Sequence, residues 1–127
     1  MHGQGPANFL GWRFSDTLDT YGFVTAKPGE RLFLSNGSEG KTYSGVVGPG
    51  GSVTHLKPFA NRGGESVAVG PDGRIYIANG QVFVYAADGS EVGRIDLPER
   101  PLQLVFGGAK GRTLFILAHH ALFAVEI

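Results

Sequence analysis

The chain contains no cysteine, which excludes disulfide bonds and thiolate chemistry. It has no excess of charge, because 11 Lys and Arg residues balance 11 Asp and Glu residues. Such a balance offers neither a basic surface for nucleic acid nor an acidic tail. No apolar run approaches the ~20 residues that a membrane-spanning helix needs. We therefore expect no nucleic-acid or membrane partner, and the lack of cysteine fits a cytoplasmic location.

Helical periodicity is also missing, whereas glycine is abundant, with 21 residues among 127. Wherever apolar residues begin to follow a helical spacing, a Gly or Pro interrupts them. Short alternating apolar runs between turn residues are frequent, and these are typical of strands. The composition therefore predicts an all-β fold.

The chain repeats itself with a period near 40. Residues 28–37, PGERLFLSNG, return at 71–80 as PDGRIYIANG, and residues 111–119, GRTLFILAH, are a looser copy. Each copy is a turn, an alternating apolar strand and a small or polar exit. A period of this length made of strands and turns is typical of β-propeller blades.

The repeat divides residues 1–127 into three parts of a partial propeller, about half of a closed ring. A first blade at 21–62 is expected to hold strands at 23–26, 31–35, 42–47 and 53–59. A second blade at 63–99 is expected to hold strands at 66–69, 75–78, 82–86 and 91–97. An incomplete last blade at 100–127 has only three strands, at 102–106, 114–118 and 122–127. Residues 1–20 are expected to be a lead with one orphan strand at 8–14.

The incomplete last blade has consequences for assembly. A three-stranded blade leaves an edge of unpaired backbone groups, which invites pairing with another strand. The orphan strand at 8–14 is suited to fill that place. Because closed propellers usually need at least four blades, three blades require a complement. We expect a homodimer or a missing complementary half-propeller, which a different chain or the rest of a longer protein would supply.

Several segments resemble the regucalcin (senescence marker protein)/gluconolactonase/luciferin-regenerating enzyme family of six-bladed propellers. The resemblance is carried by GESVAVGPDGRIYIA at 64–78, NGQVFVY at 79–85, PLQLVFGG at 101–108 and RTLFI at 112–116. It covers roughly residues 20–127 and matches only the C-terminal half of a family member. It implies metal-dependent hydrolysis of a sugar lactone or a related ester, with one divalent cation, often calcium, on the propeller axis.

The resemblance also implies where the metal lies. Family members bind it through a Glu, an Asn and an Asp at the starts of inner strands. Glu65 aligns with the Asp, Tyr21 stands where the Asn would be, and the Glu falls outside this chain. Calcium prefers several oxygen ligands, so Glu65 is the expected metal ligand and catalytic carboxylate. The alternative for Glu65 is a salt bridge to Arg62 or Arg100, since a carboxylate at the start of a buried strand needs a partner.

Further candidates lie in turns expected on the same face as Glu65. His119 is a candidate general base and His120 a candidate substrate contact, because imidazole titrates near neutral pH. Neighbouring strand residues point to opposite sides, so the two histidines do not easily share an ion. Asn36 and Asn79 occupy the equivalent turns of the other two blades.

Arg100 and Tyr21 complete the candidate substrate-binding set, together with Asn36, Asn79 and His120. For Asn36, Asn79 and the histidines the alternative is ordinary turn chemistry. For Tyr21 it is packing.

Three functions stay open at this point, because propellers host many unrelated activities. The first is a lactonase-type hydrolase acting on a lactone or sugar-like molecule. The second is a non-catalytic binding or scaffold module, and the third is an inactive fragment of a larger propeller enzyme. The sequence holds no phosphate loop, no nucleophile elbow and no zinc-ligand spacing.

Overall fold

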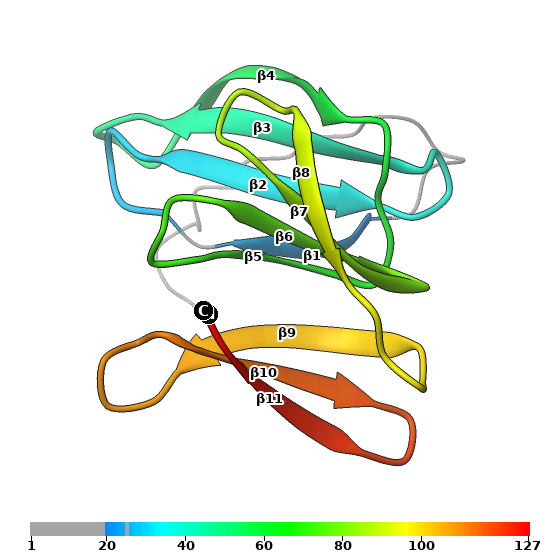
Figure 1. Cartoon of the computed structure of the whole chain (residues 1–127). Helices are drawn as coiled ribbons and strands as arrows, with labels where there is room; N and C mark the ends of the chain where they lie inside the picture. Colours follow the sequence, from blue (N-terminus) through cyan, green and yellow to red (C-terminus); the bar gives the residue numbers. More distant parts are fainter. Residues whose placement is uncertain (1–19, 25) are drawn as a thin grey trace, which may run out of the picture.

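The structure is a computed structural model that describes residues 20–24 and 26–127. All strands of these residues belong to three antiparallel sheets, which confirms the all-β class (Figure 1). The first sheet holds β1 (Thr20–Val24), β2 (Arg31–Asn36), β3 (Lys41–Val47) and β4 (Val53–Ala60). The second holds β5 (Ser66–Val69), β6 (Ile75–Asn79), β7 (Gln81–Tyr85) and β8 (Glu91–Ile95). The third holds β9 (Pro101–Gly107), β10 (Thr113–Ala118) and β11 (Leu122–Glu126). Within the described part of the chain, no helix has the length and hydrophobicity needed to cross a membrane.

Strands β2 to β11 lie within two residues of the ranges that the sequence predicts, whereas β1 differs. The sequence predicts this strand at 23–26, but it runs from Thr20 to Val24. Thr20 pairs with Asn36 and Gly22 with Ser35, through a β-bulge that skips one residue. Backbone pairing with β2 therefore forms a strand in a segment whose sequence does not alternate apolar and polar residues. The expected strand at 8–14 falls outside the described residues.

The repeated turns use glycines in the left-handed region of backbone conformation. Gly73 (φ 79°) closes the turn between β5 and β6, and Gly80 (φ 75°) closes the turn between β6 and β7. A side chain is disfavoured there, so glycine fixes where each strand ends. In the first of these turns Asp72 Oδ1 accepts a hydrogen bond from the Arg74 N–H at 3.1 Å.

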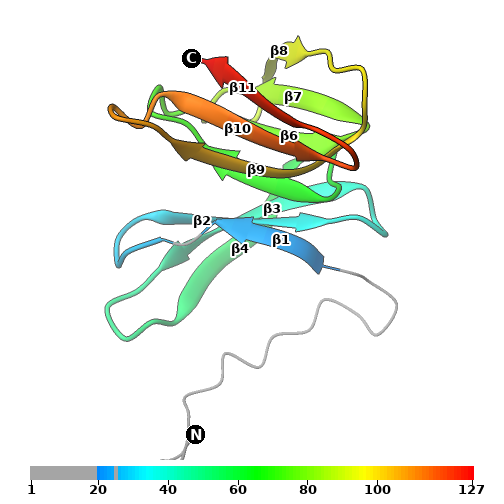
Figure 2. The same cartoon turned by 90° about the horizontal axis from the view of Figure 1, so that it is seen from below.

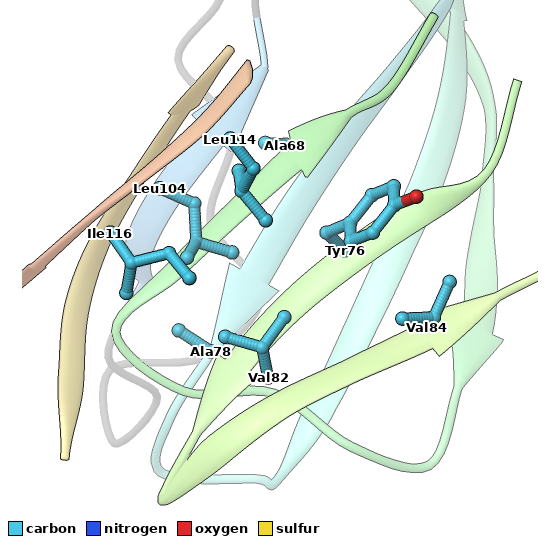
Figure 3. Close-up of a cluster of buried hydrophobic side chains, with 8 residues drawn as sticks. All are labelled: Ala68, Tyr76, Ala78, Val82, Val84, Leu104, Leu114 and Ile116. Atoms are coloured by element: carbon cyan, nitrogen blue, oxygen red, sulfur yellow. The ribbon is translucent and has the colours of Figure 1, made fainter. Parts of the chain in front are cut away.

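The sheets are stacked so that their first strands come together: β1 lies beside β5, and β5 lies beside β9 (Figure 2). Two apolar clusters fill the spaces between the sheets. The cluster between the first and second sheets contains Phe33, Ala60, Val67, Ile75, Ile77 and Tyr85. The cluster between the second and third sheets contains Ala68, Tyr76, Ala78, Val82, Val84, Leu104, Leu114 and Ile116 (Figure 3).

None of the described residues covers the second face of the third sheet, where apolar side chains are exposed. Leu114 and Ile116 of β10 point toward the second sheet and are fully buried. The alternate residue Leu117 is 47% exposed, and its pairing partner Leu122 on β11 is 65% exposed. Val105 of β9 is 50% exposed on the same side, since it pairs with Phe115, two residues before Leu117. We call Val105, Leu117 and Leu122 the open flank of the third sheet.

The second cluster predicts a clear difference between two apolar residues. Ile116→Ala should lower the free energy of unfolding by about 2–5 kcal/mol, because it leaves a cavity between the second and third sheets. Val92→Ala, at a 47% exposed position on β8, should cost less than about 1 kcal/mol. Chemical denaturation of both variants measures this difference. Equal losses would contradict the packing described here.

Candidate functional site

The pairing register gathers the candidate residues at one end of the sheets. Thr20 pairs with Asn36, Ser66 with Ala78, and Pro101 with Ala118. The starts of β1, β5 and β9 therefore lie at the same end as the β2–β3, β6–β7 and β10–β11 turns (Figure 1). We call this end the front face and the opposite end the back face. The front face receives every candidate: Tyr21, Asn36, Glu65, Asn79, Arg100, His119 and His120.

A short connector, Arg62-Gly63-Gly64, brings the chain from the first sheet to Glu65. Ser35 Oγ donates a hydrogen bond to the Gly64 carbonyl and accepts one from the Gly64 N–H, each at 2.8 Å. Thr42 Oγ1 donates to the Arg62 carbonyl at 2.8 Å. Both hydroxyl side chains are fully buried. The first sheet therefore holds the connector through buried hydroxyl groups, because the connector's own polar groups have to be satisfied there.

The connector passes so close to its neighbours that only glycine fits. A Cβ on Gly63 would lie 2.2 Å from the Lys41 carbonyl oxygen, and one on Gly64 would lie 2.3 Å from the Ala78 carbonyl oxygen. The Glu65 N–H then donates to that same Ala78 oxygen at 3.0 Å. The backbone of Glu65 is thus fixed against the end of β6.

The Glu65 carboxylate is paired with Arg100. The Arg100 Nε donates to Glu65 Oε1 at 2.7 Å, and a terminal guanidinium nitrogen contacts the same oxygen. The Glu65 side chain is 23% exposed and that of Arg100 61%. Of the two salt bridges that the sequence leaves open for Glu65, the structure forms this one. The described residues contain no group of three Asp, Glu or His side chains placed to hold a metal ion.

Arg62, the other possible partner of Glu65, contacts different residues. Its Nε donates to the Tyr85 hydroxyl at 3.0 Å, and it forms an ion pair with Glu91 at 3.2 Å. Its guanidinium carbon lies 3.5 Å from the centre of the Phe83 ring. Burial works against the charged form, but the bonds to Tyr85 and Glu91 outweigh it and raise the pKa of Arg62. Arg62 therefore joins the first sheet to the second and is not a site residue.

The side-chain amide of Asn36 is only partly hydrogen-bonded. Its side chain is fully buried at the end of β2, and its Oδ1 accepts the Glu39 N–H at 3.1 Å. Its Nδ2 is the one buried side-chain nitrogen or oxygen without a hydrogen-bond partner among the described residues. A buried donor without an acceptor is costly, and Nδ2 is closed off from the surface because the Asn36 side chain is fully buried. Asn79 ends β6 at the equivalent place and is half-buried.

The two histidines form a pair at the β10–β11 turn. Their rings meet edge to face with centroids 4.2 Å apart, and both residues are exposed. The His120 N–H donates to Glu99 Oε1 at 2.8 Å, and His120 Nδ1 lies 3.8 Å from the same oxygen. Glu99 is a carboxylate that the sequence analysis missed. The sequence could have indicated Glu99 as a candidate, because it lies next to Arg100 just before β9.

For Tyr21 the structure describes only the backbone, whereas for Tyr43 it also describes the side chain. Tyr21 lies in β1 at the bulge between Thr20 and Gly22, and its backbone position alone is described. The Tyr43 hydroxyl bonds to Glu39, and this bond together with burial raises the pKa of Tyr43 to about 12. Tyr43 therefore stays protonated at neutral pH and does not act as a base.

A hollow of about 360 Å³ lies on the back face between the first and second sheets. It is lined by Glu30, Arg31, Phe33, Val69, Gly73, Ile75 and Ala87. Arg31 reaches across it, donates to the Ala87 carbonyl at 2.7 Å and stacks on Phe33. None of the candidate residues lines this hollow.

Comparisons with known proteins agree with the arrangement of the strands. The sequence profile of the SMP-30/gluconolactonase/LRE-like region matches residues 29–120. A structural-genomics target assigned as a gluconolactonase superposes with a TM-score of 0.74 and 24% identity, covering 87% of this chain and 39% of that one. A gluconolactonase from Xanthomonas campestris gives a TM-score of 0.74 at 21% identity, covering 91% of this chain and 40% of that one. The chain thus spans about two fifths of these proteins. No curated protein matches the sequence.

The connector predicts that one buried serine matters more than another. Ser35→Ala removes both hydrogen bonds to Gly64 and should cost about 1–3 kcal/mol of unfolding free energy. Its control is Ser44→Ala, which removes an equally buried hydroxyl that accepts only a 3.4 Å bond from Arg31. This control should cost about 1 kcal/mol or less. Chemical denaturation with amide exchange at Gly64 checks both, and unchanged protection of Gly64 in Ser35→Ala would contradict the role of Ser35.

Proposed function

The chain belongs to the SMP-30/gluconolactonase/LRE-like family, and from this premise we propose that it is part of a propeller that hydrolyses a sugar lactone or a related ester. The observation that supports the proposal is that Glu65, Arg100, Asn36, Asn79 and the two histidines lie at the same end of the three sheets. These are the proton acceptors and hydrogen-bond donors that acyl hydrolysis needs.

Hydrolysis of a lactone requires a base for the attacking water and donors for the acyl oxygen. His119 is exposed, and its imidazole is the candidate group to accept the proton of the attacking water. Glu65 is the second candidate, because a fixed carboxylate can receive or return a proton. The Arg100 guanidinium supplies N–H donors to the acyl oxygen, where negative charge develops.

The remaining candidates fit the hydroxyl groups of a sugar-like substrate. Asn79, His120 and Tyr21 stand at front-face positions, whereas Nδ2 of Asn36 is buried and would bind a substrate only if the β2–β3 turn moved. Amide and imidazole groups bind hydroxyls by donating and accepting hydrogen bonds. A small polar substrate lying across the front face is therefore the ligand we propose.

We propose a divalent cation, calcium by the family resemblance, only for a propeller whose ring is completed by a complementary half. At the family's metal position the described residues offer one carboxylate, Glu65, and Arg100 already neutralises it. Calcium takes 6–8 oxygen ligands, and the described residues do not supply such a set on their own. The missing ligands would have to come from a complementary half.

We propose a second copy of this chain as the complementary half. The open flank of the third sheet is apolar, and on the first sheet Leu32, Leu34 and Leu56 are only half-buried. Packing the first sheet of each copy against the open flank of the other gives a closed two-fold ring of six sheets. Such a ring brings two front faces together around one axis, so each site would draw residues from both copies.

A non-catalytic binding module is the second candidate, and a specific observation favours it. Arg100 pairs with the carboxylate that the family uses for metal, and Tyr21 replaces the family Asn. A module of this kind would keep the front face for ligand binding without turnover. Turnover of a lactone, as opposed to binding without turnover, separates the two functions.

The catalytic proposal is tested with glucono-1,5-lactone as substrate, after subtraction of spontaneous hydrolysis. Glu65→Gln and His119→Ala should each lower kcat/KM by about 100-fold, because each removes a proton-transfer group. Lys57→Gln, an exposed change away from the front face, should leave kcat/KM unchanged. Lack of turnover by the unaltered chain, with lactone binding retained, would replace the hydrolase by the binding module.

Assembly is tested by charging the open flank. The chain should run at twice its monomer mass in size-exclusion chromatography with light scattering. Leu117→Lys combined with Leu122→Lys should shift it to the monomer, because two charges would be buried in the interface. Val92→Lys, an equally exposed apolar position on β8, should leave the mass unchanged. A monomeric unaltered chain at micromolar concentration would exclude the two-copy ring.

A further inference from the structure

We propose that the back face binds a small aryl carboxylate, and that Arg31 receives its carboxylate group. The site consists of the hollow of about 360 Å³ between the first and second sheets and a second hollow of about 380 Å³ beside it. None of the front-face candidates lines either hollow, so this site does not depend on the proposed function.

The two hollows share one cation. Arg31 and Ala87 line both of them, and Nη1 of Arg31 donates to the Ala87 carbonyl at 2.7 Å. The guanidinium therefore lies at the border between the hollows. Pockets that bind small molecules begin at about 300 Å³, so each hollow has room for a compact ligand. The second hollow is lined by Arg31, Ser44, Lys57, Pro58, Phe59, Ala87 and Asp88.

The cations of this lining have no counter-ion. Among the described residues, neither Arg31 nor Lys57 forms an ion pair with a carboxylate. The two carboxylates of the lining, those of Glu30 and Asp88, each accept a hydrogen bond within their own turn. Because these charges balance, attraction at long range is weak. An anion therefore has to be held by direct hydrogen bonds to the guanidinium.

The guanidinium of Arg31 is already held in place for such bonds. Its carbon lies 4.8 Å from the centre of the Phe33 ring and 5.2 Å from that of Phe59. Nη1 donates to the Ala87 carbonyl, and Nη2 lies 3.4 Å from the Ser44 hydroxyl. The remaining N–H groups make no hydrogen bond within the described part of the chain. A planar guanidinium fixed in this way can bind a carboxylate through two N–H groups at a small entropy cost.

The wall of the first hollow selects the rest of the ligand. Phe33 and Ile75 are buried, and Val69 is 37% exposed at the rim. A flat aromatic ring gains free energy from burial against such a wall and from edge contact with Phe33. A ligand rich in hydroxyl groups would instead lose hydrogen bonds to water there. The two requirements together describe an aryl carboxylate rather than a sugar.

The test titrates sodium benzoate into the full chain at constant ionic strength and follows the backbone amide resonances. The signals of Val69 and Ala87 should shift to saturation, whereas those of Asn79 and His120 on the front face should not move. Benzyl alcohol supplies the ring without the charge, and acetate supplies the charge without the ring. Each should bind at least about fivefold more weakly than benzoate, because each lacks one of the two contacts.

Two variants with matched controls locate the site. Arg31→Gln should weaken benzoate binding by at least about tenfold, because charge-assisted hydrogen bonds are lost. Arg94→Gln, which removes an exposed arginine of β8, should bind benzoate as the unaltered chain does. Val69→Phe should weaken binding by filling the hollow while Arg31 stays in place. Val92→Phe, at an exposed valine of β8, is its control and should have no effect.

Several results would overturn the site. These are the absence of benzoate binding, binding no tighter than that of acetate or benzyl alcohol, and shifts confined to the front face. Binding that survives both Arg31→Gln and Val69→Phe would overturn it as well. Circular dichroism checks that each variant is folded, and if Arg31→Gln is not, Val69→Phe and its control decide. Turnover of a lactone affects none of these outcomes, so this proposal and the proposed function fail separately.

Discussion

Burial of the second sheet on both faces is the constraint on which the rest of the molecule depends. Along β6, Ile75 and Ile77 pack toward the first sheet, while Tyr76 and Ala78 pack toward the third. A strand directs successive side chains to opposite faces, so a sheet with two apolar faces needs a neighbour on each. The third sheet is built in the same way, but the part of the chain that the structure describes gives it a neighbour on one side only. Its open flank is a consequence of blade construction, and stacking alone cannot cover it within the described residues.

The same alternation explains why the sequence predicts so much of the fold. Turn glycines and period-two apolar residues are local signals, and they locate β2 to β11 closely. The first strand escapes prediction because Thr20 and Gly22 carry no apolar pattern and are held by pairing with Asn36 and Ser35. Antiparallel pairing then fixes which turns share an end, and this places Glu65 on the face that also receives His119. Such inferences need only the order of the strands and the alternation of side chains between the two faces of each strand.

The contacts between side chains of the site could not be predicted in the same way. Glu65 selects Arg100, 35 residues away, rather than Arg62, three residues away. That choice depends on Arg62 being drawn to Phe83 and Tyr85 on another strand. Ser35 and Thr42 resemble ordinary polar residues in the sequence, yet they hold the connector by hydrogen bonds across a sheet boundary. Sequence patterns report local geometry, whereas these bonds depend on how whole sheets are stacked.

The charge at Glu65 connects the fold to its function. A carboxylate at the start of a buried strand needs a positive partner, because burial penalises an unpaired charge. The described residues meet this need internally with Arg100, at low cost, since the pair stays partly solvated. The charge at this end of the sheets is therefore balanced by two residues from different parts of the chain, Glu65 just before β5 and Arg100 just before β9, which only the stacking of the second and third sheets brings together.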